Sequence, residues 1–307
     1  MEVILAIDGG GSRTRCLVID HAGVIAGEAT SGPSNHLLVD RDIVARSLAE
    51  AIETSLQAAG VTREDVVCLS AGMAGVDYDG VGAAEMNELL CVLGFKNPVI
   101  NGDMVIAHAG ALGARAGVVA LSGTGSCVLG IGVHGDRVKV GGWGPIYGDE
   151  GSAYRIGEMS LRAAARAYDG RGPATALVQS LTHALGTSNF NETVARVYVE
   201  AMEPREIAAL SRVAYETAES GDQVAREIFL RAGVELAESV TAAIRQLDLD
   251  EPLVSYQGSV LASCDLLRRQ FIDLLQQTIE DVVVVSPEFE PVIGAYLLGC
   301  KAIGWEK

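Results

Sequence analysis

Aromatic residues and positive charges are scarce in this chain of 307 residues. Only 5% of the residues are Phe, Trp or Tyr, and 23 Lys and Arg stand against 40 Asp and Glu, for a formal net charge of −17. A surface of that sign repels phosphate backbones and anionic lipid headgroups, which argues against a nucleic-acid or membrane partner. A bound phosphate would need glycine-rich backbone and a metal ion instead of a basic patch.

Paired cysteines and targeting segments are also lacking. The six cysteines form no C-x-x-C pair and no Cys–His metal spacing. We interpret them as reduced thiols of a cytoplasmic protein, with disulfides or a metal cluster as the alternative. The beginning, MEVILAIDGG, has no basic segment before its apolar run, so we expect no signal peptide, and no run of 18 uncharged residues reads as a membrane span.

The first part of the chain reads as three strands followed by an alternation of helices and strands. Apolar runs predict strands at 2–7, 15–20 and 24–30, and the glycine-rich turn 8–14 joins the first two. A Rossmann unit would pass from that turn directly into a helix, so the order indicates an antiparallel meander. The elements that we expect next are helix 40–59, strand 66–75, helix 82–93, strand 98–101 and helix 104–114.

The pattern begins again near residue 117. Residues 117–132 read as strand, glycine-rich turn and strand, and a third strand follows at 137–143. This duplication predicts two similar lobes. We place an N-terminal small lobe at 1–116 and a C-terminal large lobe at 117–307, with the last helix, about 291–303, as a candidate to pack back toward the small lobe.

The turn DGGGSRT, residues 8–14, is a candidate phosphate-binding loop. Glycines let backbone N–H groups approach an anion, and hydroxyl groups add donors. A plain hairpin with left-handed backbone explains the glycines equally well. Asp8 favours the phosphate interpretation, because a carboxylate beside phosphates needs a cation between them, and Mg²⁺ is the usual ion.

Two later segments have similar chemistry. LSGTGS at 121–126 combines two glycines with the hydroxyls of Ser122, Thr124 and Ser126, and QGS at 257–259 is a candidate nucleoside contact. Two phosphate hairpins at equivalent places of two repeats indicate a polyphosphate. Together with QGS they predict three separate contacts to ATP.

Four motifs in this order resemble the N-acetylglucosamine kinase branch, grouped with the BadF/BadG-type ATPases, of the sugar kinase/Hsp70/actin superfamily. They are DGGGSRT, SGTGS, GGWGPIYGDEGSAYRIG and QGSVLAS, and the resemblance runs from residue 4 to about residue 300. It implies an α/β fold of two ribonuclease-H-like lobes, each with a mixed five-stranded sheet, and an interlobe cleft for ATP and sugar. The implied activity is ATP-dependent phosphorylation of the 6-hydroxyl of an amino sugar, N-acetylglucosamine or glucosamine, by a cytoplasmic enzyme.

The resemblance also assigns the site residues. Phosphate contacts are implied for Gly9, Gly10, Gly11, Ser12, Thr14, Gly123, Thr124 and Gly125. Adenosine contacts are implied for Gly258 and Ser259, and sugar contacts for Asn35, Asp103, Ser126, Gly142, Trp143 and Asp149. Asp103 is the implied general base, and Asp8 would hold Mg²⁺ through water or phosphate.

Helix positions offer a second explanation for some of these residues. Asp149 and Glu150 precede a predicted helix, where carboxylates are favoured, and Asp103 fits an N-cap. His36 either orders the loop around Asn35 or has a purely structural role.

The chain departs from the animal enzymes of this family at Cys127, where they have an Asn that contacts the sugar. N-acetyl specificity and the choice among N-acetylglucosamine, glucosamine and other glucose-like sugars therefore stay open, as does a homodimer. Two alternatives to a kinase are an ATPase that activates a reductase or dehydratase, and a non-catalytic sugar sensor. The first would need cluster cysteines, and the second would have lost Asp103 or a phosphate hairpin.

Overall fold

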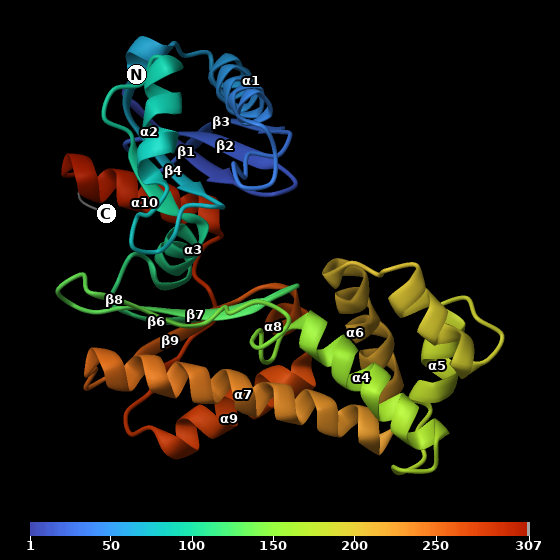
Figure 1. Cartoon of the computed structure of the whole chain (residues 1–307). Helices are drawn as coiled ribbons and strands as arrows, with labels where there is room; N and C mark the ends of the chain where they lie inside the picture. The colour runs from blue at the N-terminus through green and yellow to red at the C-terminus, as the bar shows by residue number, and fades with distance from the viewer. Residues whose placement is uncertain (306–307) are drawn as a thin grey trace. The chain divides into compact units, whose positions relative to one another are not determined.

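The computed structural model describes residues 1–305. The strand VILAIDG lies at the centre of its first sheet. The sheet has the order β3-β2-β1-β4-β5 (Figure 1). β2 is antiparallel to β1 and to β3, whereas β4 and β5 run parallel to β1. Its strands are β1 (Val3–Gly9), β2 (Thr14–Asp20), β3 (Ile25–Ser31), β4 (Val66–Met73) and β5 (Val99–Gly102).

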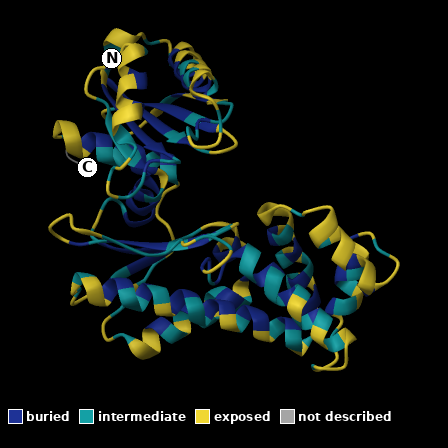
Figure 2. Ribbon diagram, viewed as in Figure 1, coloured by how far each residue is buried: buried dark blue, intermediate teal, exposed yellow. Residues whose placement is uncertain are grey.

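Both faces of this sheet are covered, because successive side chains of a strand point to opposite faces. Leu5 and Ile7 join one core with α1 (Arg41–Ala59) and α2 (Ala83–Val92). Ile4 and Ala6 join the other with α3 (Asp103–Leu112) and α10 (Pro291–Ile303). Figure 2 shows the buried strands between exposed outer helix faces.

The second sheet has the order β10-β9-β6-β7-β8, with β9 parallel to β6 and to β10. Its strands are β6 (Gly117–Ser122), β7 (Ser126–Ile131), β8 (Arg137–Gly141), β9 (Leu253–Gln257) and β10 (Val283–Val284). The helices that share its core or extend from it are α4 (Ala153–Tyr168), α5 (Leu177–Ala184), α6 (Pro204–Glu219), α7 (Gln223–Leu247), α8 (Ser259–Ser263) and α9 (Asp265–Thr278). Short 3₁₀ or π-helical turns occur at Arg63–Asp65, Phe190–Glu192 and Ala195–Val199.

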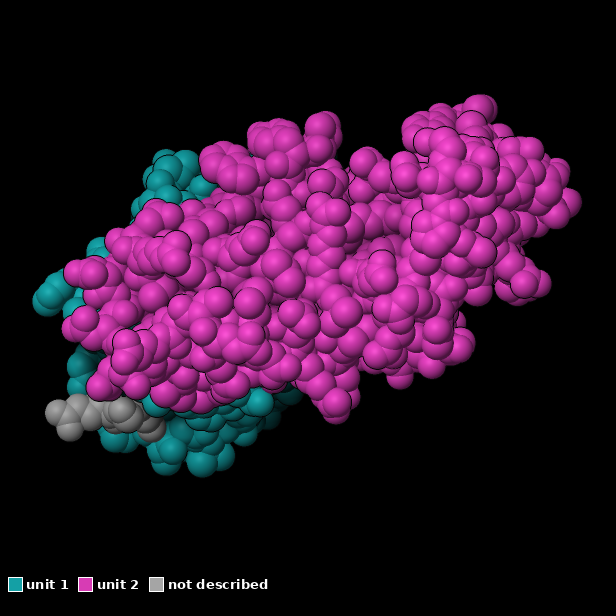
Figure 3. Space-filling view, turned by 90° about the horizontal axis from the view of Figure 1, so that it is seen from below, with its two compact units in different colours: residues 1–117, 131–137, 286–307 teal, residues 118–130, 138–285 magenta. Residues whose placement is uncertain are grey.

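The chain forms two compact units (Figure 3). Unit 1 comprises Met1–Gly117, Ile131–Arg137 and Ser286–Lys307, and unit 2 comprises Val118–Gly130 and Val138–Val285. The last helix, α10, belongs to unit 1, where it contacts α3 and the sheet.

The α/β fold with two five-stranded mixed sheets is confirmed, as is the repeated three-strand opening of each sheet. The strand β9 ends at Gln257, and the short helix α8 follows Gly258. In residues 1–305, no helix combines the length and the hydropathy that crossing a membrane requires.

Candidate functional site

Two carboxylates lie at the carboxyl edge of the first sheet. Because β1, β4 and β5 are parallel, their last residues, Gly9, Met73 and Gly102, are paired in register. Asp8 precedes the first of these and Asp103 follows the last. Burial and then the negative charge of Asp103 raise the pKa of Asp8, although neighbouring arginines oppose the shift. The two carboxylates are therefore close enough to repel each other.

Asp103 is the first residue of α3 and not its cap. The N-cap is Gly102, which makes no side-chain cap, and Asp103 Oδ1 accepts a hydrogen bond from the N–H of Met104 at 2.8 Å. The side chain is exposed. An exposed carboxylate at a strand–helix junction is available to a ligand, as a general base must be.

The first glycine hairpin is tied to the loop that follows β3. The backbone N–H of Ser34 donates to the carbonyl of Gly10 at 2.9 Å. The buried hydroxyl of Thr14 lies 2.8 Å from the carbonyl of Gly32 and 2.7 Å from the hydroxyl of Ser34. Thr14 thus holds the loop in place, while Gly11 and Ser12 in the turn are exposed. The phosphate contacts predicted for this hairpin remain predictions.

The same loop brings Asn35 to the edge of the sheet. Its Oδ1 accepts the N–H of Leu37 at 3.0 Å and lies against Gly75, as does the ring of His36. The buried Nδ1 of His36 has no hydrogen-bond partner among the described residues. The packing of the ring on Gly75 agrees with a loop-ordering role for His36.

The second hairpin is joined to the start of α4 by backbone hydrogen bonds. The N–H groups of Ala153 and Tyr154 donate to the carbonyls of Gly123 and Thr124, at 2.9 and 3.1 Å. The hydroxyl of Ser126 donates to the carbonyl of Glu150 at 2.7 Å. The segments SGTGS and GDEGSA therefore form one hydrogen-bonded structure.

Asp149 is the buried centre of that structure. It has a left-handed φ of 56°, and its carboxylate accepts the backbone N–H groups of Ser126 and Gly144. Burial raises the pKa of Asp149 in spite of these hydrogen bonds. The helix-cap explanation does not apply, because Ser152 caps α4 by accepting the N–H of Arg155 at 3.1 Å. A sugar contact remains a prediction for the oxygen lone pairs that the backbone does not use.

Gly142 and Trp143 begin the loop that follows β8 and leads to Asp149. Gly142 has a φ of 70°, and a Cβ there would lie 3.0 Å from the Cβ of Cys127. The Trp143 side chain is 65% exposed and stacks on Tyr147, with ring centroids 6.4 Å apart. Such an exposed aromatic surface is suited to the apolar face of a sugar ring.

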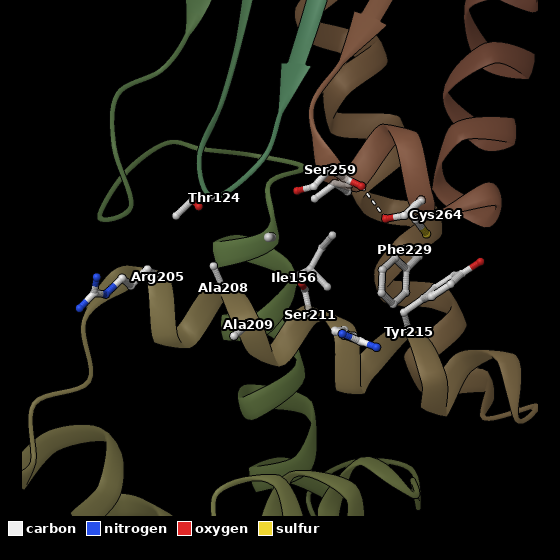
Figure 4. Close-up of a pocket in the computed structure, with 14 residues that line it drawn as sticks. Thr124, Ile156, Arg205, Ala208, Ala209, Ser211, Tyr215, Phe229, Ser259 and Cys264 are labelled. Carbon is white, nitrogen blue, oxygen red and sulfur yellow. Dashed lines mark hydrogen bonds between the residues drawn. The ribbon is translucent and has the colours of Figure 1, made fainter. Parts of the chain in front are cut away.

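A pocket of about 400 Å³ lies within unit 2 and brings together two predicted nucleotide contacts. Thr124 from the second hairpin and Ser259 at the start of α8 both line it (Figure 4). Gly258 is required between them, because a Cβ there would lie 2.1 Å from the carbonyl oxygen of Ser122 and its φ is 101°. The volume is within the range of small-molecule sites, about 300–1,000 Å³.

The sequence analysis missed one wall of this pocket, which is supplied by α6. This wall contains Ala208, Ser211 and Tyr215 at helical spacing, and Phe229 of α7 lies beside Tyr215 (Figure 4). The spacing is visible in the sequence as a helix face, but only the folded chain shows that it adjoins Ser259. The arginine in the first hairpin, Arg13, was also missed; its positive charge lowers the pKa of Asp8.

Residues 5–299 match the BadF/BadG/BcrA/BcrD ATPase family. The chain belongs to this family. It is 30% identical to the N-acetylmuramic acid/N-acetylglucosamine kinase of Clostridium acetobutylicum, over 97% of this chain and 98% of that protein. It is also 30% identical to the N-acetyl-D-glucosamine kinase of Dictyostelium discoideum, over 98% of each chain.

A solved structure supports the fold of this family member. The ROK hexokinase of Thermus thermophilus superposes with a TM-score of 0.62 at 15% identity, over 98% of this chain and 99% of that one. The family resemblance and the two-lobe α/β fold expected from the four motifs are therefore confirmed. Membership of an ATPase family makes ATP the expected nucleotide.

The residues present fit a magnesium ion bound mainly by phosphate oxygens. Within residues 1–305, no group of three or more His, Cys, Asp or Glu side chains could hold a metal ion alone. Mg²⁺ usually takes one or two carboxylates and completes its shell with water and substrate phosphates. Asp8, with its charge opposed by Asp103, is a carboxylate that a cation would stabilise.

Proposed function

We propose that this chain is an ATP-dependent kinase that phosphorylates the 6-hydroxyl of an amino sugar, either N-acetylglucosamine or glucosamine. The observation that carries the proposal is the pocket in unit 2, which is lined both by Thr124 of a glycine hairpin and by Ser259. The names of the relatives, both amino-sugar kinases, support the substrate class.

In this proposal unit 2 binds the nucleotide. The adenosine lies between α6 and α8, and the phosphates extend toward the hairpin that contains Thr124. Gly123 can admit a phosphate closely, because nothing lies within 4 Å of the position of its absent Cβ. Backbone N–H groups in glycine-rich turns bind phosphate oxygens without requiring a basic side chain.

Unit 1 supplies the acid–base group. The carboxylate of Asp103 accepts the proton of the sugar's 6-hydroxyl while that oxygen bonds to the γ-phosphorus. The bond between the γ-phosphorus and the bridging oxygen breaks, and ADP leaves with that oxygen. When bound, Mg²⁺ would neutralise charge on the phosphates, and Asp8 would hold the ion through a water molecule or through the phosphates.

The sugar contacts proposed for Asn35, Ser126, Gly142, Trp143 and Asp149 would orient the acceptor. The ring of Trp143 offers an apolar surface, and the carboxylate of Asp149 offers acceptors for sugar hydroxyls. Gly142 contacts Cys127, so the volume at residue 127 bears directly on this part of the site.

A coupled assay of ADP release tests the activity and the specificity together. We expect turnover with N-acetylglucosamine or glucosamine above that with N-acetylmuramic acid, N-acetylmannosamine and glucose. The product should be a 6-phosphate by NMR. ADP release that no sugar accelerates would contradict the proposal.

The alternative of a dehydratase-activating ATPase needs an iron–sulfur cluster. Four of the six cysteines, at 16, 68, 264 and 300, are buried, and no metal-binding group of side chains occurs in residues 1–305. Iron analysis of anaerobically purified protein separates the two functions, since the kinase should contain none.

A further inference from the structure

A second pocket, of about 370 Å³, lies wholly within unit 1. It is formed by α3, by α10 and by the turn between β7 and β8. It shares no residue with the nucleotide pocket or with the predicted phosphate and sugar contacts. The proposed function assigns this pocket no ligand.

The lining of this pocket is positively charged. Arg115, Arg137 and Lys301 line it, and no carboxylate does. This is the reverse of the chain's composition, in which 40 acidic residues outnumber 23 basic ones. Two carboxylates border the pocket: Glu288 pairs with Arg115, and Asp136 lies in the lining turn with its carboxylate against Gly132. The three cations therefore exceed these carboxylates by one positive charge.

Both arginines are already held in position. Arg115 Nε donates to the carbonyl of Leu112 at 2.8 Å, and Arg137 donates to the carbonyl of Tyr78 at 2.5 Å. A guanidinium that is ordered before binding loses less side-chain entropy when it meets an anion. The third cation, Lys301 on α10, is exposed.

The pocket also has a buried imidazole in its wall. His108 is 2% exposed, and its Nε2–H donates to the carbonyl of Gly117 at 2.9 Å. Burial and the charge of Arg137 lower the pKa of His108 to about 4, so the ring is neutral at pH 7. The positive charge of the pocket therefore comes from its arginine and lysine side chains.

The chain passes between the two units beside this pocket. It crosses after Gly117, Gly130, Arg137 and Val285. Ala116, Ile131 and Arg137, which adjoin three of these four crossings, line the pocket. A ligand here would contact the segments that connect the units.

We infer that this pocket binds a small phosphate-bearing anion, as free phosphate or as the phosphate ester of a small molecule. The net positive charge of the surrounding side chains favours an anion, and planar guanidinium groups match the oxygens of a phosphate. The volume is large enough for a monosaccharide phosphate, since small-molecule sites span about 300–1,000 Å³.

Isothermal titration calorimetry on the full chain, without ATP, tests this inference. Inorganic phosphate and glucosamine 6-phosphate are titrated separately into the wild type, Lys301→Glu and the control Lys96→Glu, which reverses an exposed charge elsewhere in unit 1. We expect Lys301→Glu to weaken binding at least about tenfold, because it puts a like charge beside the anion, and Lys96→Glu to leave it unchanged.

The two titrants distinguish the sources of the phosphate group. Tighter binding of glucosamine 6-phosphate indicates a site for an ester, and equal or tighter binding of inorganic phosphate indicates a site for the free ion. No binding of either one to the wild type, or equal affinities in Lys301→Glu and the wild type, would overturn the inference. In the second case the anion binds elsewhere, including at the nucleotide pocket.

Hydrogen exchange locates the site independently of affinity. Phosphate should slow exchange in residues 114–117 and 131–137 of the wild type, and this protection should be lost in Lys301→Glu. Protection confined to the glycine hairpins would contradict the assignment. If charge reversal unfolds the protein, Lys301→Gln provides the same test with an expected loss of about threefold. Neither measurement involves turnover, so both stand if the kinase proposal fails.

Discussion

The negative charge of Asp103, which directly follows β5, raises the pKa of Asp8 in β1. The parallel strand β4 lies between these two strands. The burial of Asp8 and its repulsion by Asp103 lower the stability of the protein when no ligand is bound. A divalent cation bound beside Asp8 would offset this loss of stability. This repulsion supports the proposal that the edge of the first sheet binds a cation and its phosphates.

The first prediction concerns Asp8→Asn, which we expect to raise the melting temperature while nearly abolishing turnover. Since the folded-state pKa of Asp8 is raised above 3.8, the folded protein binds the proton more tightly than the unfolded chain. The resulting destabilisation is present when Asp8 is ionised in the folded protein, and it is lost as the pH falls to 3.8. Asn carries no charge at any pH, so it removes this destabilisation.

Thermal unfolding of the apo proteins from pH 3 to 8 checks this sign. The difference between Asp8→Asn and the wild type should grow as the pH rises above 3.8 and level off above the raised folded-state pKa. Glu50→Gln, at an exposed position on α1, is the control for loss of one negative charge. An Asp8→Asn protein that melts below the wild type at pH 7 would contradict the prediction.

The second prediction is that Asp103→Asn lowers kcat at least about 100-fold and leaves both KM values near normal. Asn keeps the shape of the side chain but cannot take the proton of the 6-hydroxyl. Because Asp103 is exposed and does not cap α3, the melting temperature should not fall. Steady-state kinetics with near-normal kcat would remove Asp103 from the role of base.

The order of helices and strands in residues 2–143 could be predicted closely from the sequence, since it depends on local periodicity. The last helix was expected at 291–303 and occupies Pro291–Ile303. The wall that α6 contributes to the nucleotide pocket could not be predicted, because only tertiary packing brings Tyr215 near Ser259.

The role of Asp149 shows the same limit within the site. Its sequence position allowed a helix cap or a sugar ligand, whereas the structure shows it accepting hydrogen bonds from Gly144 of the same loop and from Ser126 of the second hairpin. Such a role depends on distances between segments that no local pattern contains.

The third prediction follows from that role. Asp149→Asn should lower the free energy of unfolding by about 1–3 kcal/mol, because an amide has one acceptor oxygen instead of two and carries no charge to strengthen its hydrogen bonds. If the carboxylate also binds sugar hydroxyls, the sugar KM should rise roughly tenfold. Denaturant unfolding and kinetics measure the two effects separately. An unchanged sugar KM beside a lowered stability would make Asp149 purely structural.

The fourth prediction compares two glycines near the nucleotide pocket. At Gly123 the backbone φ is not left-handed and the position of a Cβ is open, so Gly123→Ala should leave stability within about 0.5 kcal/mol of the wild type. It should nevertheless raise the KM for ATP if a phosphate approaches this turn. Gly258→Ala is the contrasting variant, because its methyl group would overlap the backbone of Ser122 and should reduce stability itself. A normal KM for ATP in a stable Gly123→Ala protein would move the phosphates away from the second hairpin.

The fifth prediction concerns His108, whose imidazole joins α3 to Gly117. Its pKa falls from 6.5 to about 4 on folding, so the unfolded chain binds the proton more tightly between these values. The free energy of unfolding therefore decreases as the pH falls through this window, by on the order of 3 kcal/mol from this group alone. His108→Gln retains a donor for the carbonyl of Gly117 and cannot be protonated, so its stability should fall less steeply between pH 6.5 and 4. Urea unfolding at several pH values measures the slopes, with His134→Gln, at an exposed histidine of the same unit, as the matched control. Parallel slopes for the wild type and His108→Gln would mean that His108 is not held neutral by the fold, and that the destabilisation at low pH arises from other groups.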